Sequence, residues 1–224
     1  MWTVKNDRFL TSLGVERIIG VVRGDLGDDD LTACARALGR GGIHSLEVAL
    51  TTPAAIAAIE SASRALPDFN FGLGTVLDVD TARLAVLAGA KFVVTPAPRP
   101  AVITLCRRYQ IPVVSGAFGE ADISAAFQAG ADAVKIFPGE QFGPAHVSAL
   151  HSRVPQIPLL PIGGVTPDTI AEFVRAGALA AFAGSSLIDD SVLRQRNWDA
   201  LTERAEAFAL AIRSLPQLQD LVEN

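Results

Sequence analysis

Residues 112–137, PVVSGAFGEADISAAFQAGADAVKIF, hold one complete example of the pattern that decides the fold. An apolar run of strand length, Pro112–Ser115, leads through a turn into an Ala-rich amphipathic segment, Glu120–Ala129. Gly130 then stands where a helix takes its C-terminal cap, and a second apolar run, Ala133–Phe137, follows. Two strands joined in this way lie parallel, because the helix carries the chain back across the sheet.

The same pattern recurs along the chain at intervals of roughly 20 to 30 residues. Strands are predicted at Ile18–Val22, Ser45–Leu50, Asn70–Leu73, Phe92–Thr95, Pro112–Ser115, Ala133–Phe137, Pro158–Ile162 and Ala180–Ala183. Helices are predicted at Asp30–Gly39, Pro53–Ala65, Asp80–Ala88, Arg99–Tyr109, Glu120–Ala129, Pro144–His151, Pro167–Ala176 and from about Trp198 onward. Eight such units in 224 residues favour an α/β fold of the (β/α)8 TIM-barrel type. An open doubly wound sheet is the alternative that the same pattern permits.

The chain is expected to form one domain, 1–224, because no linker, low-complexity tract or charge block divides it. The length is ample for a hydrophobic core. The first 17 residues precede the first predicted strand. We expect them to form an extra N-terminal helix that covers the bottom of the barrel.

Composition excludes several classes of protein. Nineteen Lys and Arg against 24 Asp and Glu give a net charge of −5, whereas a nucleic-acid binder is normally basic. The apolar stretch Ala176–Ile188 has 13 residues, and a membrane span needs about 20. Met1–Arg8 lacks the apolar block of a signal peptide, and two cysteines make no disulfide framework and have no histidine close in sequence for zinc. We therefore expect a cytoplasmic protein without metal, membrane or nucleic-acid partners.

Lys135 is the most informative residue. It stands near the carboxyl end of a predicted strand, and barrel enzymes carry their catalytic residues at these ends. The chain has three lysines against sixteen arginines, and this one lies within an apolar strand. If Lys135 and Ala133 share a face, the amine points into the barrel, where burial lowers its pKa. A neutral amine can condense with a carbonyl to form a Schiff base. A lysine that snorkels from the strand end, or that pairs with a structural carboxylate, is the alternative.

Glu47 is the acidic residue that we expect to face Lys135 inside the barrel. Leu46 and Val48 form one face of its strand, and Ser45 and Ala49 lie on the face of Glu47 itself. If the aliphatic face packs on helices, Glu47 points inward beside small neighbours, where it could move protons next to Lys135. A structural ion pair that fills the barrel is the alternative reading.

Two glycine-containing turns predict an anion site. Gly163 and Gly164 follow the seventh strand, and Gly184 and Ser185 follow the eighth. Backbone amides freed by glycine can surround a phosphate, and barrel enzymes often hold phosphate at these two loops. Plain tight turns are the alternative.

Arg23 and Thr75 also stand at strand ends. Arg23 could hold a substrate carboxylate through its bidentate fork, with Thr75 donating a hydroxyl to the same group. The alternative role of Arg23 is a surface ion pair, and that of Thr75 is a helix cap or an ordinary turn residue. Gly72 and Gly74 do not continue into a dinucleotide fingerprint, so NAD binding is not expected.

Assembled in order, these residues resemble the 2-keto-3-deoxy-6-phosphogluconate and 2-keto-3-deoxy-6-phosphogalactonate (KDPG/KDPGal) aldolase family. The likeness runs from about Ile18 to Ile188. Its motifs are Val22-Arg23-Gly24, Leu46-Glu47-Val48-Ala49-Leu50-Thr51-Thr52-Pro53, Gly74-Thr75-Val76-Leu77, Val94-Thr95-Pro96, Lys135-Ile136-Phe137-Pro138, Gly163-Gly164-Val165 and Gly184-Ser185.

The resemblance implies a class I mechanism. Lys135 would form an iminium with the 2-oxo carbon, and Glu47 would take the proton of the C4 hydroxyl as the C3–C4 bond breaks. Pyruvate and glyceraldehyde 3-phosphate would be the products, with no metal or cofactor and a homotrimer as the assembly. Arg23 and Thr75 would hold the carboxylate, Pro96 would line the pocket, and the phosphate would be held by Gly163, Gly164, Gly184 and Ser185.

Departures from the family pattern bear on the substrate. Thr51 stands where phosphogluconate-type members usually have Arg, and Ile162 stands where they tend to have Thr. Both resemble the phosphogalactonate type, which is therefore the expected substrate, with the phosphogluconate epimer or a related 2-keto-3-deoxy acid as alternatives. The segment Ser115–Glu120 lacks the family's usual Pro-Gly start, which leaves the pocket wall after the fifth strand open.

Two rival functions share the anion loops. A phosphosugar epimerase needs acid and base groups but no amine nucleophile. A non-catalytic phosphosugar-binding barrel needs neither acid and base groups nor an amine nucleophile. Replacing Lys135 would then leave phosphosugar binding in place and would have no effect on turnover. Trapping of a pyruvate adduct on Lys135 separates the aldolase from both.

Overall fold

The computed structural model describes residues 8–26, 29–213 and 215, which form a barrel of eight parallel strands. The strands are β1 (Ile18–Val22), β2 (Ser45–Ala49), β3 (Asn70–Gly74), β4 (Phe92–Thr95), β5 (Val113–Ala117), β6 (Ala133–Ile136), β7 (Leu159–Pro161) and β8 (Ala181–Ala183). Their order is β7-β6-β5-β4-β3-β2-β1-β8, and a parallel bridge between Ile162 and Phe182 brings the two ends of the sheet together. The TIM-barrel prediction is confirmed, and the open doubly wound sheet is excluded.

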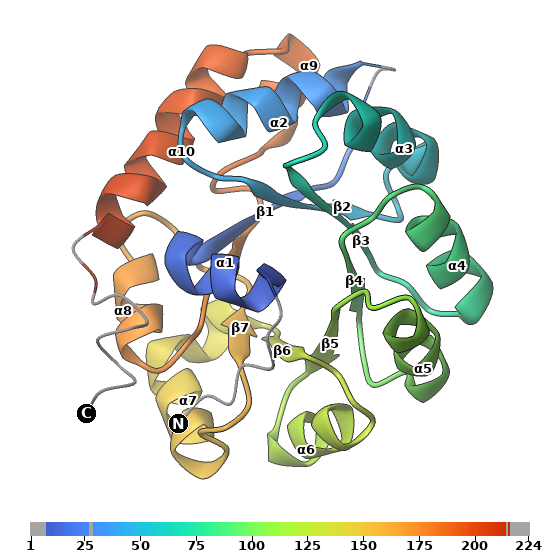
Figure 1. Cartoon of the computed structure of the whole chain (residues 1–224). Helices are drawn as coiled ribbons and strands as arrows, with labels where there is room; N and C mark the ends of the chain where they lie inside the picture. The colour runs from blue at the N-terminus through green and yellow to red at the C-terminus, as the bar shows by residue number, and fades with distance from the viewer. Residues whose placement is uncertain (1–7, 27–28, 214, 216–224) are drawn as a thin grey trace.

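Helices surround the strands and cover one end of the barrel, as Figure 1 shows in a view along the barrel. They are α1 (Arg8–Glu16), α2 (Asp30–Arg40), α3 (Ala55–Ala65), α4 (Val79–Leu87), α5 (Pro100–Arg108), α6 (Glu120–Gln128), α7 (Gly139–Arg153), α8 (Ile170–Arg175), α9 (Asp190–Gln195) and α10 (Trp198–Arg213). None of them, within the described part of the chain, is long and apolar enough to cross a membrane.

Helix α1 closes one end of the barrel, where it lies across the opening in Figure 1. Its Phe9, Leu10 and Leu13 belong to the apolar cluster that fills the barrel interior, and the Phe9 ring stacks on that of Phe92 with centroids 4.7 Å apart. The expected N-terminal helix is therefore present. The first seven residues, part of the segment in which it was expected, lie outside the described residues.

Most predicted strands and helices are shifted at their ends by no more than three residues, and two helices differ by more. Helix α7 begins at Gly139 instead of Pro144, because two helical pieces meet at Gly143, whose φ of 62° breaks the helical backbone. Helix α9 was not predicted at all. It has only six residues, and its start is marked by the Asp189 side chain, which accepts a hydrogen bond of 2.9 Å from the Val192 amide.

Side chains alternate strictly between the two faces of the sheet. On β2, Leu46 and Val48 pack in the outer cluster, between the barrel and the helices. On β6, Val134 does the same, whereas Ala133 belongs to the interior cluster. Period-two alternation therefore turns the residues between them, Glu47 and Lys135, toward the barrel axis.

Candidate active site

Two adjoining cavities lie at the carboxyl ends of the strands and contain the predicted site residues. The first, of about 450 Å³, contains Lys135, Glu47, Thr75 and Pro96 of the predicted site. The second, of about 900 Å³, contains Gly163, Gly164, Gly184 and Ser185. Arg23, Phe137 and Ile162 line both, so they form the boundary between the two.

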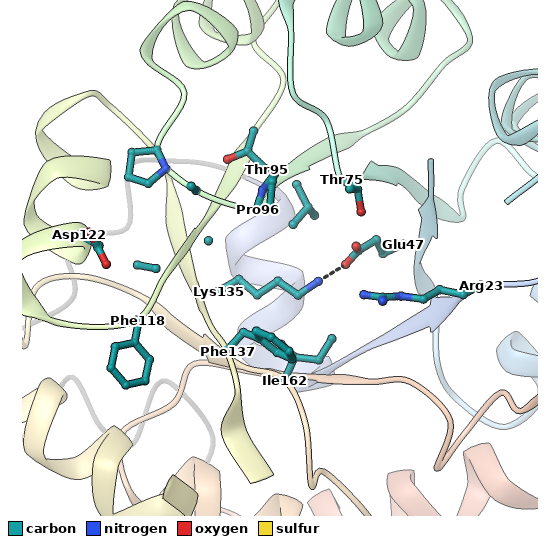
Figure 2. A pocket seen from close by; sticks show the side chains of 15 residues that line it. Arg23, Glu47, Thr75, Thr95, Pro96, Phe118, Asp122, Lys135, Phe137 and Ile162 are labelled. Atoms are coloured by element: carbon teal, nitrogen blue, oxygen red, sulfur yellow. Dashed lines mark hydrogen bonds and ion pairs between the residues drawn. The ribbon is translucent and has the colours of Figure 1, made fainter. Parts of the chain in front are cut away.

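Lys135 and Glu47 meet directly in the first cavity, as Figure 2 shows. Lys135 Nζ lies 2.7 Å from Glu47 Oε2, and the two side chains are only 10 % and 1 % exposed. Nζ also lies 4.2 Å from the centre of the Phe182 ring, a cation–π distance. One amine and one carboxylate are thus held in contact in a mostly apolar environment.

Burial lowers the pKa of Lys135 below its ordinary value of 10.5, because desolvation disfavours the ammonium form. The neighbouring Glu47 carboxylate opposes this change, whereas the positive charge of Arg23 adds to it. Figure 2 shows the Arg23 side chain reaching toward Lys135 from the same side of the cavity as Glu47. The lowered pKa increases the share of neutral amine, the form that attacks a carbonyl.

The turn after β3 shapes the position of the Glu47 carboxylate. A Cβ added at Gly74 would lie 2.0 Å from Glu47 Oε1, so only glycine leaves room for this rotamer. Thr75 follows with a φ of 64°, a left-handed conformation that is uncommon for a β-branched residue and is typical of functional sites. Figure 2 shows the Thr75 hydroxyl directed toward Glu47.

Replacing Gly74 by alanine is expected to push the Glu47 carboxylate away from Lys135. A displacement of about 1 Å at such a site can cost about 100-fold in rate, so we expect kcat to fall by about that factor. Steady-state kinetics with circular dichroism as a check of folding measures it. Gly119→Ala is the matched control, because a Cβ there would meet nothing within 4 Å. Equal activity of the two variants would contradict the role assigned to Gly74.

The second cavity has the glycine turns expected of an anion site, and it also holds carboxylates that sequence reasoning missed. The φ values of Gly163 and Gly164 are 98° and 68°, which favour glycine. Glu140 lies against both: a Cβ on Gly163 would meet its Oε2 and a Cβ on Gly164 its Cα. Asp189 and Asp190 line the same cavity. An anion bound at these turns would therefore share the cavity with negative charge.

Other residues at the strand ends were placed differently from expectation or were not foreseen. Thr51 is exposed and is not among the residues that line either cavity. Thr52 is buried, and its hydroxyl has no hydrogen-bond partner among the described residues. Phe182 and Asp122 were missed. Phe182 could be found only from its inward position on β8, and Asp122 has the pattern of an ordinary acid in the first turn of a helix.

The described residues contain no group of three or more His, Cys, Asp or Glu side chains placed to hold a metal ion. The charged groups that act on Lys135 are a single carboxylate, that of Glu47, and the guanidinium of Arg23. What the first cavity can do chemically is therefore to present an amine nucleophile, a proton acceptor in contact with it, and a cation for a substrate carboxylate.

Comparisons with known proteins agree with this arrangement. A family profile described as "Aldolase: KDPG and KHG aldolase" matches residues 11–204. The chain is 31 % identical over 207 residues to the 2-dehydro-3-deoxy-phosphogluconate aldolase of Pseudomonas aeruginosa, covering 92 % of this chain and 93 % of that one. It is also 31 % identical over 202 residues to the 2-dehydro-3-deoxy-6-phosphogalactonate aldolase of Escherichia coli K12, covering 89 % and 96 %.

Among solved structures, the chain is similar to a KDPG aldolase from Legionella pneumophila, in which pyruvate was captured at low pH as a covalent carbinolamine intermediate. The TM-score is 0.81 at 26 % identity, over 92 % of this chain and 99 % of that one. Some of the similar proteins are thus named as phosphogluconate aldolases and others as phosphogalactonate aldolases. One of them was captured with pyruvate bound covalently.

Proposed function

Because this chain belongs to the KDPG and KHG aldolase family and is therefore a carbon–carbon lyase, we propose that it cleaves 2-keto-3-deoxy-6-phosphogalactonate to pyruvate and glyceraldehyde 3-phosphate. The single observation that carries the proposal is the buried contact of 2.7 Å between Lys135 Nζ and Glu47 Oε2 at the carboxyl end of the barrel. That contact supplies both groups that a Schiff-base aldolase needs.

The proposed reaction begins with attack of the neutral Lys135 amine on the 2-oxo carbon. Loss of water gives an iminium, whose positive nitrogen accepts the electron pair of the C3–C4 bond. Glu47, directly or through water, takes the proton of the C4 hydroxyl as that bond breaks. The enamine that remains is protonated at C3 and hydrolysed to pyruvate. The iminium performs the polarisation that a metal ion would otherwise supply, so we propose a reaction without metal or cofactor.

We infer the substrate-binding roles from the two cavities. We assign the keto-acid carboxylate to Arg23 and Thr75 beside Lys135, with Pro96 as part of the wall. We assign the phosphate to the glycine-lined cavity, with backbone amides of Gly163, Gly164 and Gly184 and the hydroxyl of Ser185 as donors. Arg23 lines both cavities, so its charge acts at the point where a bound chain would pass between them.

The galacto configuration at C4 is the finer part of the proposal. Ile162 lies at the boundary of the two cavities and offers an apolar side chain there, and Thr51 brings no cation to the end of β2. We expect the galacto epimer to have a kcat/KM about tenfold or more above that of the gluco epimer, measured by cleavage coupled to detection of pyruvate.

Ile162→Thr provides the matched test of that preference. A hydroxyl at the boundary restores the residue type of phosphogluconate-type members, so the galacto-to-gluco ratio should fall in this variant. A strong gluco preference in the unchanged enzyme would reverse the assignment of the substrate and would leave the aldolase reaction intact.

We further propose that the enzyme works in the cytoplasm as a homotrimer, with residues 1–224 as one domain. The family resemblance supports the trimer, and the uninterrupted β/α pattern supports the single domain. Sedimentation velocity of the full chain measures the assembly directly.

A further inference from the structure

The cavity that holds Lys135 continues past the lysine, away from Glu47. Figure 2 shows Arg23 and Glu47 on one side of Lys135, with Asp122 and Phe118 on the other. The lining of this outer arm consists of Ala97, Pro98, Gly116, Ala117, Phe118 and Asp122. The arm is separate from the glycine-lined cavity proposed for the phosphate, because none of these residues lines that cavity.

Small residues line the part of the arm nearest to Lys135. Gly116 is the direct partner of Lys135 in the register of β5 and β6. A Cβ added there would lie 2.3 Å from the backbone oxygen of Pro96, so glycine lets the chain after β4 pack closely against β5 and places no side chain in the arm. Ala117 follows with a methyl group only. A bound chain could therefore pass from Lys135 toward Asp122.

Asp122 is the only charged residue among those that line the outer arm, and it differs from its neighbour on the same helix. Glu120, also in the first turn of α6, is paired with Arg153 at 3.1 Å and does not line the cavity. Asp122 is exposed and faces the cavity instead. An ionised carboxylate can only accept hydrogen bonds, so this end of the arm suits a group that donates them.

An aromatic cluster braces the rim beside Asp122. The ring centroids of Phe118 and Phe142 are 5.3 Å apart, and the His146 ring lies 5.6 Å from the first and 5.2 Å from the second. His146 Nε2 also lies 3.3 Å from the backbone oxygen of Phe118. These contacts join the loop after β5 to α7 and hold the wall of the arm in place.

We propose that this outer arm is a subsite for the hydroxylated, unphosphorylated tail of a sugar acid, with Asp122 accepting hydrogen bonds from its hydroxyl groups. The inference rests on the proposed aldolase function and widens its substrates to 2-keto-3-deoxy acids that carry no phosphate. Their tail lies toward Asp122, and a phosphorylated tail lies toward the glycine turns.

The bond changes are those of the retro-aldol reaction. The C4 hydroxyl gives its proton to Glu47, directly or through water, and C4 becomes the carbonyl carbon of the departing aldose. The electron pair of the C3–C4 bond passes into the Lys135 iminium. The resulting enamine takes a proton at C3, and water releases pyruvate and returns the free amine. No oxidant, reductant or further reactant is required.

The test runs the reaction in the direction of addition, with pyruvate and two four-carbon aldehydes. D-Erythrose carries hydroxyl groups along its chain, and butanal carries none. In Asp122→Ala the ratio of kcat/KM for erythrose to that for butanal should fall about tenfold or more, since a site built to bind hydroxyl groups discriminates strongly. Asp122→Asn, which keeps an acceptor oxygen without the charge, should fall less. Glu120→Ala, the matched acid of the same helical turn, should leave the ratio unchanged.

The outcomes separate the subsite from the aldolase. An unchanged ratio in Asp122→Ala, in enzyme that still forms a trappable pyruvate adduct, overturns the subsite and leaves the proposed function in place. An equal fall in Glu120→Ala overturns it as well, because the effect would then come from the helix and not from the cavity. Absence of any pyruvate adduct in the unchanged enzyme overturns the proposed function and the subsite together.

Discussion

Replacing Lys135 by methionine is expected to abolish aldol cleavage, with kcat lower by about 10⁴-fold or more. Methionine has a similar length and fills the space beside Phe182, but it has no amine to bond to the 2-oxo carbon. Without the iminium, the electron pair of the C3–C4 bond has no acceptor. Pyruvate release measured by a coupled assay gives the rate, and circular dichroism reports whether the barrel still folds.

Two control variants test whether the loss of activity comes from the missing covalent bond. One keeps the positive charge at position 135, and the other makes the same substitution at a different lysine. Lys135→Arg keeps a cation next to Glu47 but cannot form the iminium, so it should be as inactive as Lys135→Met. Lys91→Met makes the same substitution at a lysine just before β4, where the amine donates to the backbone oxygen of Pro67. Its activity should stay within about twofold of the unchanged enzyme, as for a surface substitution away from the site. Retained cleavage in Lys135→Arg would mean that the lysine acts only through its charge.

Replacing Glu47 by glutamine is expected to slow cleavage by about 10²- to 10⁴-fold, the usual range for loss of a general base. The amide keeps the shape of the side chain but cannot take the proton of the C4 hydroxyl. Attack of Lys135 on pyruvate does not require that proton transfer. We therefore expect this variant still to form the covalent adduct while it cleaves slowly, a separation that Lys135→Met cannot show.

The same variant changes the pH at which the adduct forms. The Glu47 carboxylate raises the pKa of Lys135 by favouring the ammonium form, against the larger lowering by burial. Removing the carboxylate should lower this pKa further, so the neutral amine appears at lower pH. The rate of borohydride trapping as a function of pH should therefore reach half of its maximum at a lower pH in Glu47→Gln. A shift to higher pH would contradict the electrostatic account of the pair.

Much of the fold could be predicted because the local signals repeat. Apolar runs followed by Ala-rich helices, many of which close on a glycine, repeat the unit seen in residues 112–137, and the count of eight points to a closed barrel. The inward direction of Lys135 and Glu47 followed from alternation alone, since their strand neighbours are aliphatic and the sheet is covered by helices. Alternation depends only on sequence order, so it needs no knowledge of distant parts of the chain.

Features set by contacts between distant segments could not be predicted. Phe182 lies under the Lys135 amine because of the way β8 and β6 are placed around the barrel, which no local pattern states. Asp122 and Glu120 are both acids of the first turn of α6, and the turn of the helix points them in different directions, but which of the two faces the cavity depends on how α6 packs on the barrel. The division of the site into two cavities likewise depends on where Arg23, Phe137 and Ile162 come together.

The most direct test of the account is the covalent bond between Lys135 and a keto acid. The enzyme is incubated with pyruvate, reduced with borohydride and digested, and the modified peptide is identified by mass spectrometry. The account predicts a reduced pyruvate adduct on Lys135, dependent on pyruvate and absent from Lys5 and Lys91. No adduct, or an adduct on another lysine, would contradict it.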